Sequence, residues 1–363
     1  MSTINPWILG GCMLPHAPQF FTQPETEDKN TIAAVQAIGA RIGEELKALK
    51  PDLWIVIGND HAQQFFANCA PPFTLHVGGK GRGTFAGRTF DFNIASEVAF
   101  AVVKDLYRAG FDPAFTSTAE IDYALGIPMT HLGIGAAPVL PLYVNAYLPP
   151  QPTMERCYLF GQALGRSLAA LGIRAVVMAS GGMSHFPGTD RYAQPDLAFD
   201  ESVLVPLRQG RLRTLLGYEE ALLDDTGNIE LRCWSVAAGL LGERVPDVVQ
   251  LNPSWHHNYA SLGWWSTPQQ GVKPHYPQVA PELASLTGAL FQMANDRAAR
   301  DAWFADPVAY ADRHHVSGRQ RELLVSFDAP AIVALGIHPL LLFLVRMHVE
   351  RERGQAQGGM AKV

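Results

Sequence analysis

The sequence has few of the features that mark disulfide-rich, nucleic-acid-binding or secreted proteins. Its four cysteines, Cys12, Cys69, Cys157 and Cys233, include no CxxC pair, which argues against a disulfide framework or a zinc ribbon. No long basic run is present, and the formal net charge of −6 argues against nucleic acid or an anionic membrane as the main partner. We therefore expect a cytoplasmic protein that acts on a small molecule.

Long uninterrupted hydrophobic runs are also missing. The apolar segment WILGGCML near the N-terminus is short, contains glycine and lacks a basic region before it, so it predicts a strand rather than a signal peptide. The apolar segment 329–345 contains Pro330, His338 and Pro339, which argues against a membrane-spanning helix. We expect no membrane segment.

What the sequence does contain predicts an α/β fold. Hydrophobic residues make up 48% of the chain and charged residues 17%, as in a compact globular protein. Ile32, Val35, Ile38 and Ile42 form an apolar stripe at helical spacing, with Asn30 or Thr31 as the possible cap. Short apolar runs predict buried strands at 7–13, 53–58, 138–145 and 174–179. This alternation predicts a central mixed sheet flanked by helices on both faces, with functional groups where strands end.

The C-terminal third differs in composition from the rest. Residues 252–281 are rich in Trp, Tyr, His and Pro and lack periodicity, so they predict a loop and linker. We expect a large domain over 1–275, a small all-helical domain over 283–350, and a flexible polar tail over 351–363. At 363 residues, the chain is long enough for such a division.

Three histidines occur in similar contexts, each after an apolar strand. They are His16 in LPHAP, His61 in GNDHAQQF and His185 in SGGMSHFPGT. Strands of one sheet can deliver such side chains to a common edge, whereas a single histidine is more often a structural residue. Three matched contexts favour a functional site.

A carboxylate could complete a metal site with two of these histidines. Non-haem iron(II) that binds both substrate and dioxygen typically has two imidazole ligands and one carboxylate. Glu230 in DDTGNIELRCW is a candidate, but it also lies at an expected helix start, where Asn228 or Thr226 can cap and an acidic residue is ordinary. On these residues alone, a role in capping is favoured for Glu230.

The motifs LPHAP, VIGNDH, SGGMSH and GNIELRCW, in this order, resemble those of class III (type II) extradiol ring-cleavage dioxygenases, typified by protocatechuate 4,5-dioxygenase. Residues 1–275 resemble the catalytic subunit of that enzyme, and residues 283–350 resemble its small helical subunit. The resemblance therefore implies that two subunits are fused in one chain.

The resemblance also assigns roles to residues. It implies that His16, His61 and Glu230 bind Fe(II), that His185 is the catalytic acid/base, and that both atoms of O2 enter an ortho-hydroxylated aromatic ring. His131, in IPMTHLGIG, would contact substrate or O2, although the family's preceding Asp and following Gly are absent here. Asp60 is a candidate to orient His61, or else a solvent-facing residue at a strand end.

The identity of the ring remains open at this stage. His256, His257 and Tyr259 could bind the substrate, whereas the neighbouring tryptophans favour packing. A protocatechuate- or gallate-like ring and a hydroxypyridone such as 3-hydroxy-4-pyridone both fit the resemblance. The alternatives are a relative with another metal or non-oxygenase chemistry, and a non-catalytic subunit. We also expect a homodimer.

Overall fold

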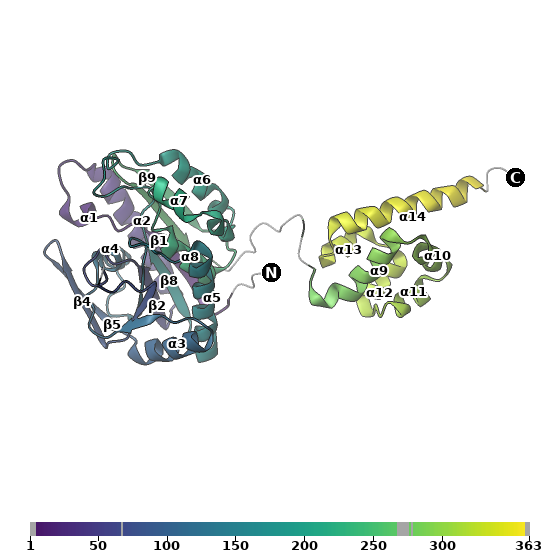
Figure 1. Cartoon of the computed structure of the whole chain (residues 1–363), viewed down its shortest axis with the longest axis horizontal. Helices are drawn as coiled ribbons and strands as arrows, with labels where there is room; N and C mark the ends of the chain where they lie inside the picture. Colours follow the sequence, from purple (N-terminus) through teal and green to yellow (C-terminus); the bar gives the residue numbers. More distant parts are fainter. Residues whose placement is uncertain (1–4, 67, 267–275, 277–278, 360–363) are drawn as a thin grey trace. The chain divides into compact units, whose positions relative to one another are not determined.

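The computed structural model describes residues 5–66, 68–266, 276 and 279–359, the last five of these by their backbone alone. It divides the chain into two compact units, residues 2–272 and residues 273–363 (Figure 1). Each unit has its own hydrophobic core.

Four parallel strands form the centre of a ten-stranded mixed sheet in the first unit. In spatial order they are β7 (Pro138–Val144), β2 (Leu53–Gly58), β8 (Ala175–Ser180) and β1 (Ile8–Leu14). These strands lie within a residue of the predicted positions. Because both faces are covered, the strands are almost wholly buried.

Further strands extend the sheet on both sides, and several of them are antiparallel. They are β3 (Phe73–His76), β4 (Lys80–Phe85), β5 (Arg88–Ile94), β6 (Ala114–Thr116), β9 (Val248–Pro253) and β10 (Asn258–Trp264). The prediction of an irregular loop from residue 252 was wrong here, because β10 pairs with β1. Every residue of β10 is buried, so the strand shows no alternation of polar and apolar residues.

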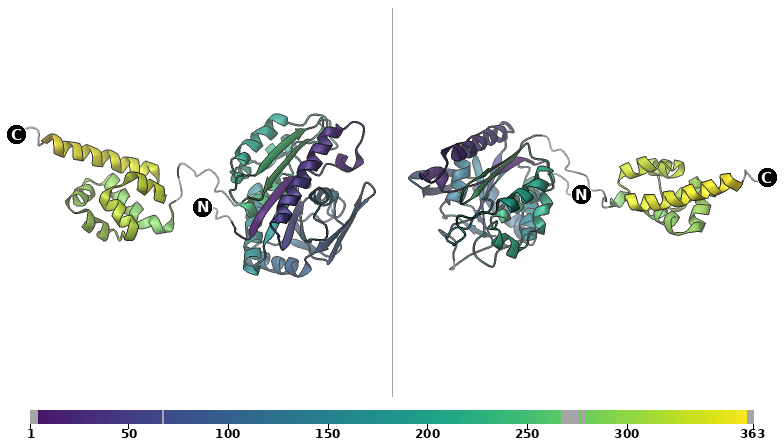
Figure 2. Two further views of the ribbon diagram at one scale, coloured as in Figure 1. Left: turned by 180° about the vertical axis from the view of Figure 1, so that it is seen from behind. Right: turned by 90° about the horizontal axis from the view of Figure 1, so that it is seen from above.

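Helices cover both faces of the sheet (Figures 1 and 2). On one face, α2 (Lys29–Ala48) and α4 (Tyr123–Leu132) pack against the sheet, in the hydrophobic core that contains Trp54 and Val56 of β2. The opposite core contains Ile55 and Ile57, and the helices there are α3 (Ser96–Arg108), α5 (Met154–Leu171) and α8 (Leu231–Leu241). The predicted fold class is thereby confirmed.

The other helical segments of this unit are short, and they are α1 (Gln19–Thr22), α6 (Leu197–Arg208), a 3-10 helix (Leu212–Gly217) and α7 (Glu220–Asp225). The start of α2 differs from the prediction. Asp28 is its N-cap and accepts hydrogen bonds from the backbone N–H groups of Asn30 and Thr31, the two residues proposed as caps.

The second unit is all-helical, as predicted. It contains a 3-10 turn (Pro281–Leu283), α9 (Ala284–Asn295), α10 (Arg297–Ala305), α11 (Pro307–Arg313), α12 (Gly318–Ser326), α13 (Ala329–Leu335) and α14 (Pro339–Gly359). The sequence indicated a flexible tail from residue 351, whereas α14 continues to Gly359; the buried Arg300 of α10 pairs with Glu352 in this extension. None of the described helices is long and apolar enough to cross a membrane.

Candidate metal centre

The histidines that the sequence places after strands meet at one edge of the sheet. His16 follows β1, His61 follows β2 and His185 follows β8. Because these strands are parallel neighbours, their carboxyl ends lie together. Glu230 reaches the same place from the start of α8, which packs on these strands.

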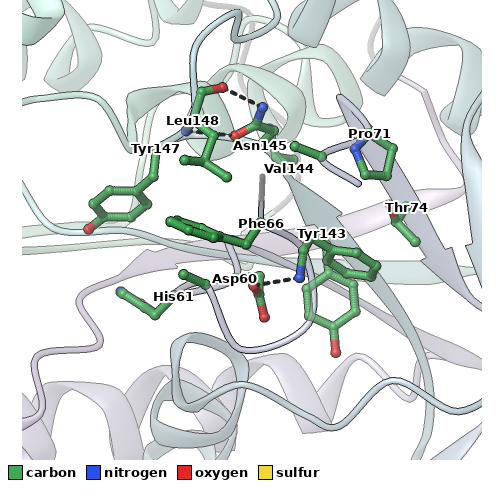
Figure 3. A pocket seen from close by; sticks show the side chains of 13 residues that line it. Asp60, His61, Phe66, Pro71, Thr74, Tyr143, Val144, Asn145, Tyr147 and Leu148 are labelled. Atoms are coloured by element: carbon green, nitrogen blue, oxygen red, sulfur yellow. Dashed lines mark hydrogen bonds between the residues drawn. The ribbon is translucent and has the colours of Figure 1, made fainter. Parts of the chain in front are cut away.

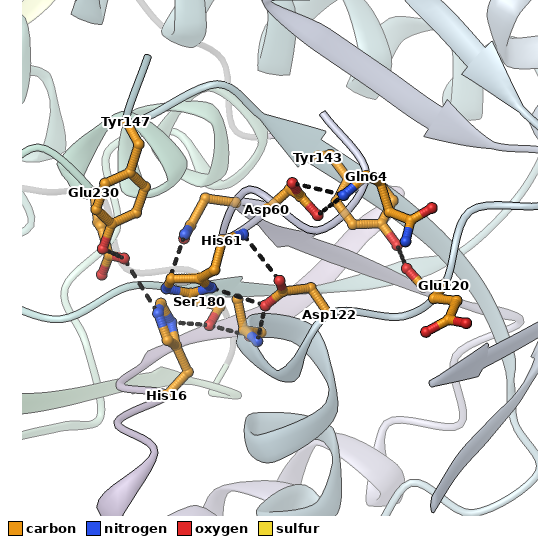
Figure 4. A network of polar contacts seen from close by, with 12 residues as sticks. His16, Asp60, His61, Gln64, Glu120, Asp122, Tyr143, Tyr147, Ser180 and Glu230 are labelled. Carbon is orange, nitrogen blue, oxygen red and sulfur yellow. Dashed lines mark hydrogen bonds and ion pairs between the residues drawn. The ribbon is translucent and has the colours of Figure 1, made fainter. Parts of the chain in front are cut away.

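Three of these side chains form a cluster that could hold a metal ion, which we call the ligand cluster: His16, His61 and Glu230. One ligand atom from each lies within 4.8 Å of the other two. The Nε2 atom of His16 is 3.2 Å from Oε1 of Glu230, and the rings of His16 and His61 have centroids 5.1 Å apart (Figure 4). His16 and Glu230 are buried, and the His61 side chain is 18% exposed.

The hydrogen-bond network assigns the proton on His16. Its Nδ1 lies 2.7 Å from the hydroxyl oxygen of Ser180, and that hydroxyl donates to the backbone carbonyl of Ala124. Because the hydroxyl hydrogen is used there, the Ser180 oxygen accepts from Nδ1–H of His16. Nε2 is therefore the ring nitrogen that is left to bind a metal, and it faces Glu230.

His61 is oriented in the same way by Asp122. Its Nδ1 is 2.9 Å from Oδ1 of Asp122, and its backbone N–H donates to Oδ2 at 2.9 Å. The Nε2 atom of His61 is 3.3 Å from the amide nitrogen of Asn59, which can donate to a lone pair. Thus His61 also presents Nε2 as an acceptor at the ligand cluster.

Asp122 performs the task for which Asp60 was a candidate. The Asp60 carboxylate instead accepts backbone N–H bonds from Gln64 and Phe65 in its own loop. Asp122 is fully buried, and it is also the N-cap of α4 through the N–H of Ala124. One residue thus fixes both a helix start and a metal-site imidazole.

Glu230 does not use its side chain to cap α8. It is the N-cap residue, but its backbone has helical angles and its carboxylate makes no cap hydrogen bond. Oε2 accepts from the backbone N–H of Gly182 at 2.6 Å, and Oε1 accepts from the hydroxyl of Tyr147 at 2.9 Å. The capping interpretation favoured by the residues alone was therefore wrong.

These contacts leave three electron-pair donors directed at one buried region. Two imidazole lone pairs and a carboxylate repel one another unless a cation or a proton lies between them. The donor set, two nitrogens and one carboxylate oxygen, fits a divalent first-row metal such as iron or zinc. The residues present therefore fit a metal ion.

Electrostatics favours an ionised carboxylate in this cluster. Burial alone would raise the pKa of Glu230, but positive charge on the rings of His16, His185 and His61, together with the hydrogen bond from His16, outweighs it and holds that pKa well below the ordinary value. Burial would lower the pKa of His61, yet the hydrogen bond to Asp122 and the nearby carboxylates raise it. Both shifts favour an ionised carboxylate beside positive charge, an arrangement that a bound cation also satisfies.

His185 lies beside the ligand cluster and presents an acceptor atom there. Its Nδ1–H donates to the carbonyl of Met183 at 2.9 Å, so the lone pair is on Nε2, which is 4.0 Å from Oε1 of Glu230. Burial lowers its pKa, which keeps the imidazole neutral. The hydroxyl of Tyr147 is 3.3 Å from the same Nε2 atom.

His257 stacks on His185, with ring centroids 4.1 Å apart and planes 7° apart. A Cβ atom at Gly182 would lie 1.7 Å from Nε2 of His257, so only glycine fits there. Gly182 therefore has two roles: it leaves space for the ring of His257, and its backbone N–H donates a hydrogen bond to Glu230.

A cavity of about 330 Å³ adjoins the ligand cluster. His61 and Tyr147 lie on one side of it, and Phe66, Pro71 and Val144 form part of its wall (Figure 3). Its size is in the range found for pockets that bind small molecules. A substrate in this cavity would have access to the ligand cluster.

The structure places three other predicted site residues away from the ligand cluster. His131 packs against Phe20 and Phe21, and on α4 it is eight residues, or about 12 Å, beyond Tyr123, which stacks on His61. His256 and Tyr259 are buried around Glu27. Of the three residues proposed to line a substrate site near position 257, only His257 contacts His185.

Sequence reasoning did not identify Asp122, Ser180 or Tyr147. Tyr147 follows β7, so extending the strand-end argument to this fourth parallel strand would have suggested it. Asp122 could have been found only as a helix cap, because its contact with His61 joins residues far apart in sequence.

Fold and donor set together define a candidate metal site of the class with two histidines and one carboxylate, placed at the carboxyl edge of an α/β sheet. The family model described as the catalytic LigB subunit of aromatic ring-opening dioxygenases matches residues 10–266. The chain belongs to this family, and it is an extradiol ring-cleaving dioxygenase, as the motifs predicted.

Named relatives agree with this assignment. The 2,3-dihydroxyphenylpropionate/2,3-dihydroxicinnamic acid 1,2-dioxygenase of Klebsiella pneumoniae strain 342 is 29% identical over 252 residues, which is 69% of this chain and 76% of the relative. An enzyme of the same name, numbered 2, from Pseudomonas putida is 30% identical over 63% of this chain and 68% of its own. The crystal structure of the uncharacterized protein JW3007 from Escherichia coli K12 matches 70% of this chain and 99% of its own with a TM-score of 0.45 and 16% identity.

Proposed function

We propose that this dioxygenase depends on Fe(II), held by His16, His61 and Glu230, and that it opens a catecholic or analogous ortho-hydroxylated ring. The observation that supports it best is that one ligand atom from each of these residues lies within 4.8 Å of the other two, while Nδ1 of each histidine is held on the far side by Ser180 or Asp122. Three protein ligands on one side leave positions for a substrate and for dioxygen. When bound, Fe(II) would orient and couple these two reactants.

His185 is the general acid/base in this proposal. Its Nε2 atom carries a lone pair beside the ligand cluster, and its Nδ1–H is fixed by the Met183 carbonyl. A neutral imidazole so placed can accept a proton from a substrate hydroxyl and return it to an oxygen atom when the ring opens. Water is largely excluded, because His185, Glu230 and His257 are buried or nearly so.

Tyr147 would hold the side chains of Glu230 and His185 in fixed positions relative to each other. Its hydroxyl lies within hydrogen-bonding distance of both Glu230 and His185. Burial and the neighbouring Glu230 raise its pKa well above the ordinary value, so it stays a protonated donor. His131 has no part in these contacts and is not included among the catalytic groups.

The organisation of the chain is part of the proposal. The family match ends at residue 266, and the helical unit follows it. We infer that this unit corresponds to the small subunit of related enzymes and that the fused chain forms a cytoplasmic homodimer. A light-scattering mass equal to one chain would exclude the dimer.

The decisive experiment is anaerobic loading of the full chain with Fe(II) or, as the matched control, Zn(II). Catechols and hydroxypyridones are added, oxygen is admitted, and oxygen uptake is measured together with the absorbance of ring-opened products. We expect uptake with Fe(II) alone. Equal turnover with Zn(II) in the absence of oxygen would instead support the alternative, a relative with different metal chemistry.

A further inference from the structure

The cavity beside His61 has a wall whose chemistry selects among catechols. We propose that it binds an uncharged, apolar substituent on the substrate ring and rejects a carboxylate. This inference rests on the proposed function, since it assumes that the two ring oxygens face the ligand cluster.

The position of the cavity supports this orientation. His61, a member of the ligand cluster, and Tyr147, which contacts Glu230 and His185, both line it (Figure 3). From there it extends to the ends of β3 and β7, where Thr74 and Val144 lie. A ring held at the ligand cluster can therefore direct a substituent into the cavity, whose volume of about 330 Å³ exceeds that of a single ring.

Most of the wall is apolar. Phe65, Phe66, Pro71, Val144 and Leu148 contribute hydrocarbon surface. No lysine or arginine occurs among the residues described as lining the cavity. A carboxylate placed there would lose its hydration without gaining a cationic partner, which is costly, whereas an alkyl group would gain from burial.

Two polar side chains of the wall, Tyr143 and Asn145, already have partners. The hydroxyl of Tyr143 donates to the Glu120 carbonyl at 2.9 Å. The side chain of Asn145 donates to the Leu148 carbonyl at 2.7 Å and accepts from the Leu148 N–H at 2.9 Å. The Asn145 contacts hold the loop after β7, and the Tyr143 hydroxyl hydrogen is used by Glu120, so neither side chain is arranged to bind a carboxylate.

Asp60 adds a repulsive element. Its carboxylate lines the cavity, and its own hydrogen bonds come from backbone N–H groups rather than from a cation. A substrate carboxylate would therefore meet a like charge. The names of the relatives from Klebsiella pneumoniae and Pseudomonas putida give substrates that contain a carboxylate. We therefore expect the substrate specificity of this chain to differ from theirs.

The test compares two substrates that differ chiefly in charge, 3-propylcatechol and 3-(2,3-dihydroxyphenyl)propionate. With the Fe(II)-loaded full chain, we expect kcat/KM to be about tenfold or more higher for 3-propylcatechol. Binding of both compounds under anaerobic conditions, followed by calorimetry, should show the same order. Equal or better binding and turnover of the propionate would overturn the inference.

Substitution in the wall provides a second measurement. Phe66 lines the cavity and is 50% exposed, so Phe66→Arg can add a cation without burying it fully. We expect Phe66→Arg to shift the preference toward the propionate by about tenfold, and Phe66→Leu, the matched control, to keep the preference for 3-propylcatechol. If Phe66→Arg does not fold, Ala70→Lys, at another exposed lining position, serves the same purpose. An unchanged preference in the folded cationic variant would contradict the inference.

The two proposals fail in different ways. If the Fe(II)-loaded chain consumes oxygen with neither catechol nor with other ring substrates, the proposed function is wrong and the inference falls with it. If it cleaves the propionate at least as well as 3-propylcatechol, the proposed function stands and only the inference is wrong.

Discussion

Two buried glutamates in the catalytic unit each contact a histidine, yet their surroundings differ in a way that separates structure from function. Glu27 lies just before α2 and is 2.8 Å from Nε2 of His256. Glu230 lies just before α8 and is 3.2 Å from Nε2 of His16. Burial and proximity alone do not distinguish these two pairs.

The Glu27 carboxylate is surrounded by donors. Trp255 donates through Nε1–H at 2.9 Å, and the hydroxyl of Ser254 approaches at 3.3 Å. The ring of His256 stacks on Tyr192 and donates to the same carboxylate from Nε2. This arrangement connects the segment before α2 to the turn before β10 and leaves the carboxylate fully hydrogen-bonded.

The Glu230 carboxylate also accepts two hydrogen bonds, from Gly182 and Tyr147, but the histidines beside it are held differently from His256. His16 and His61 donate from Nδ1 to Ser180 and Asp122, so both Nε2 lone pairs face inward. The comparison teaches that the position of a neighbour's proton, set by contacts on its far side, decides whether a buried carboxylate is a structural anchor or a metal ligand.

Exchanging each glutamate for glutamine should separate these roles most strongly. Glu230→Gln removes a proposed ligand, so we expect Fe(II) affinity to fall more than about a hundredfold and oxygen uptake to disappear. This loss exceeds the one that is typical when a residue that only contacts a ligand is changed. Glu27→Gln, the matched control, should keep iron but lower the free energy of unfolding by about 1–3 kcal/mol, because a buried acceptor for several donors is weakened. Iron content and urea unfolding measure the two effects.

The opposite pattern would break the comparison. If Glu27→Gln lost iron while Glu230→Gln kept it, the assignment of the two carboxylates would have to be reversed.

His185→Phe should come next in size. It removes the proposed acid/base while keeping an aromatic ring to stack on His257. We expect kcat to fall by about 10²–10⁴, with iron content unchanged, because proton transfer is lost but no ligand is. Unchanged oxygen uptake in the iron-loaded variant would refute the role of His185.

The sequence predicted one part of this site well and another poorly, for physical reasons. His16, His61 and His185 were found because parallel strands bring their following residues to one edge, and that rule needs only the position of the strands. Glu230 could not be separated from a helix cap, since a cap and a ligand at a helix start have the same local sequence.

Contacts between distant segments were beyond the sequence. Asp122 reaches His61 across the fold, whereas Asp60, the neighbour in sequence, turns to its own loop. In the same way, β10 was mistaken for part of a loop because a strand buried on both faces has no alternating pattern. The four central strands were predictable because each is a short run of apolar residues, and the helical unit because helical periodicity specifies it.

Asp122→Asn tests whether a residue outside the ligand cluster controls the direction of the His61 lone pair. An amide can donate to Nδ1, which would move the proton of His61 to Nε2 and away from metal binding. We expect Fe(II) affinity to fall by about 10–100-fold. Asp60→Asn is the matched control, because Asp60 precedes His61 but does not contact its ring, and it should bind iron like the unmodified chain in an anaerobic titration.

A result in which Asp60→Asn weakens iron binding and Asp122→Asn does not would restore the orientation role that the sequence suggested for Asp60. It would also show that the contact between Asp122 and Nδ1 of His61 is structural only.

The smallest effect is expected at His131, a histidine that has no carboxylate partner. Its Nε2 atom has no hydrogen-bond partner among the described residues, and burial together with Arg88 lowers its pKa to about 4. The pKa lies below the unfolded value of 6.5, so the folded protein favours the neutral ring. This contribution to the free energy of unfolding is present above pH 6.5 and is lost as the pH falls through about 4.

His131→Leu removes this pH-dependent contribution. The unfolding free energy of the variant should therefore fall less between pH 7.5 and pH 4 than that of the unmodified chain, by at most about 3 kcal/mol. Guanidinium unfolding at several pH values measures this, and kcat at pH 7.5 should change less than about threefold, because His131 lies away from the ligand cluster. A loss of kcat comparable to that of His185→Phe, in a folded protein with full iron, would instead give His131 the substrate or dioxygen contact that the family resemblance implied.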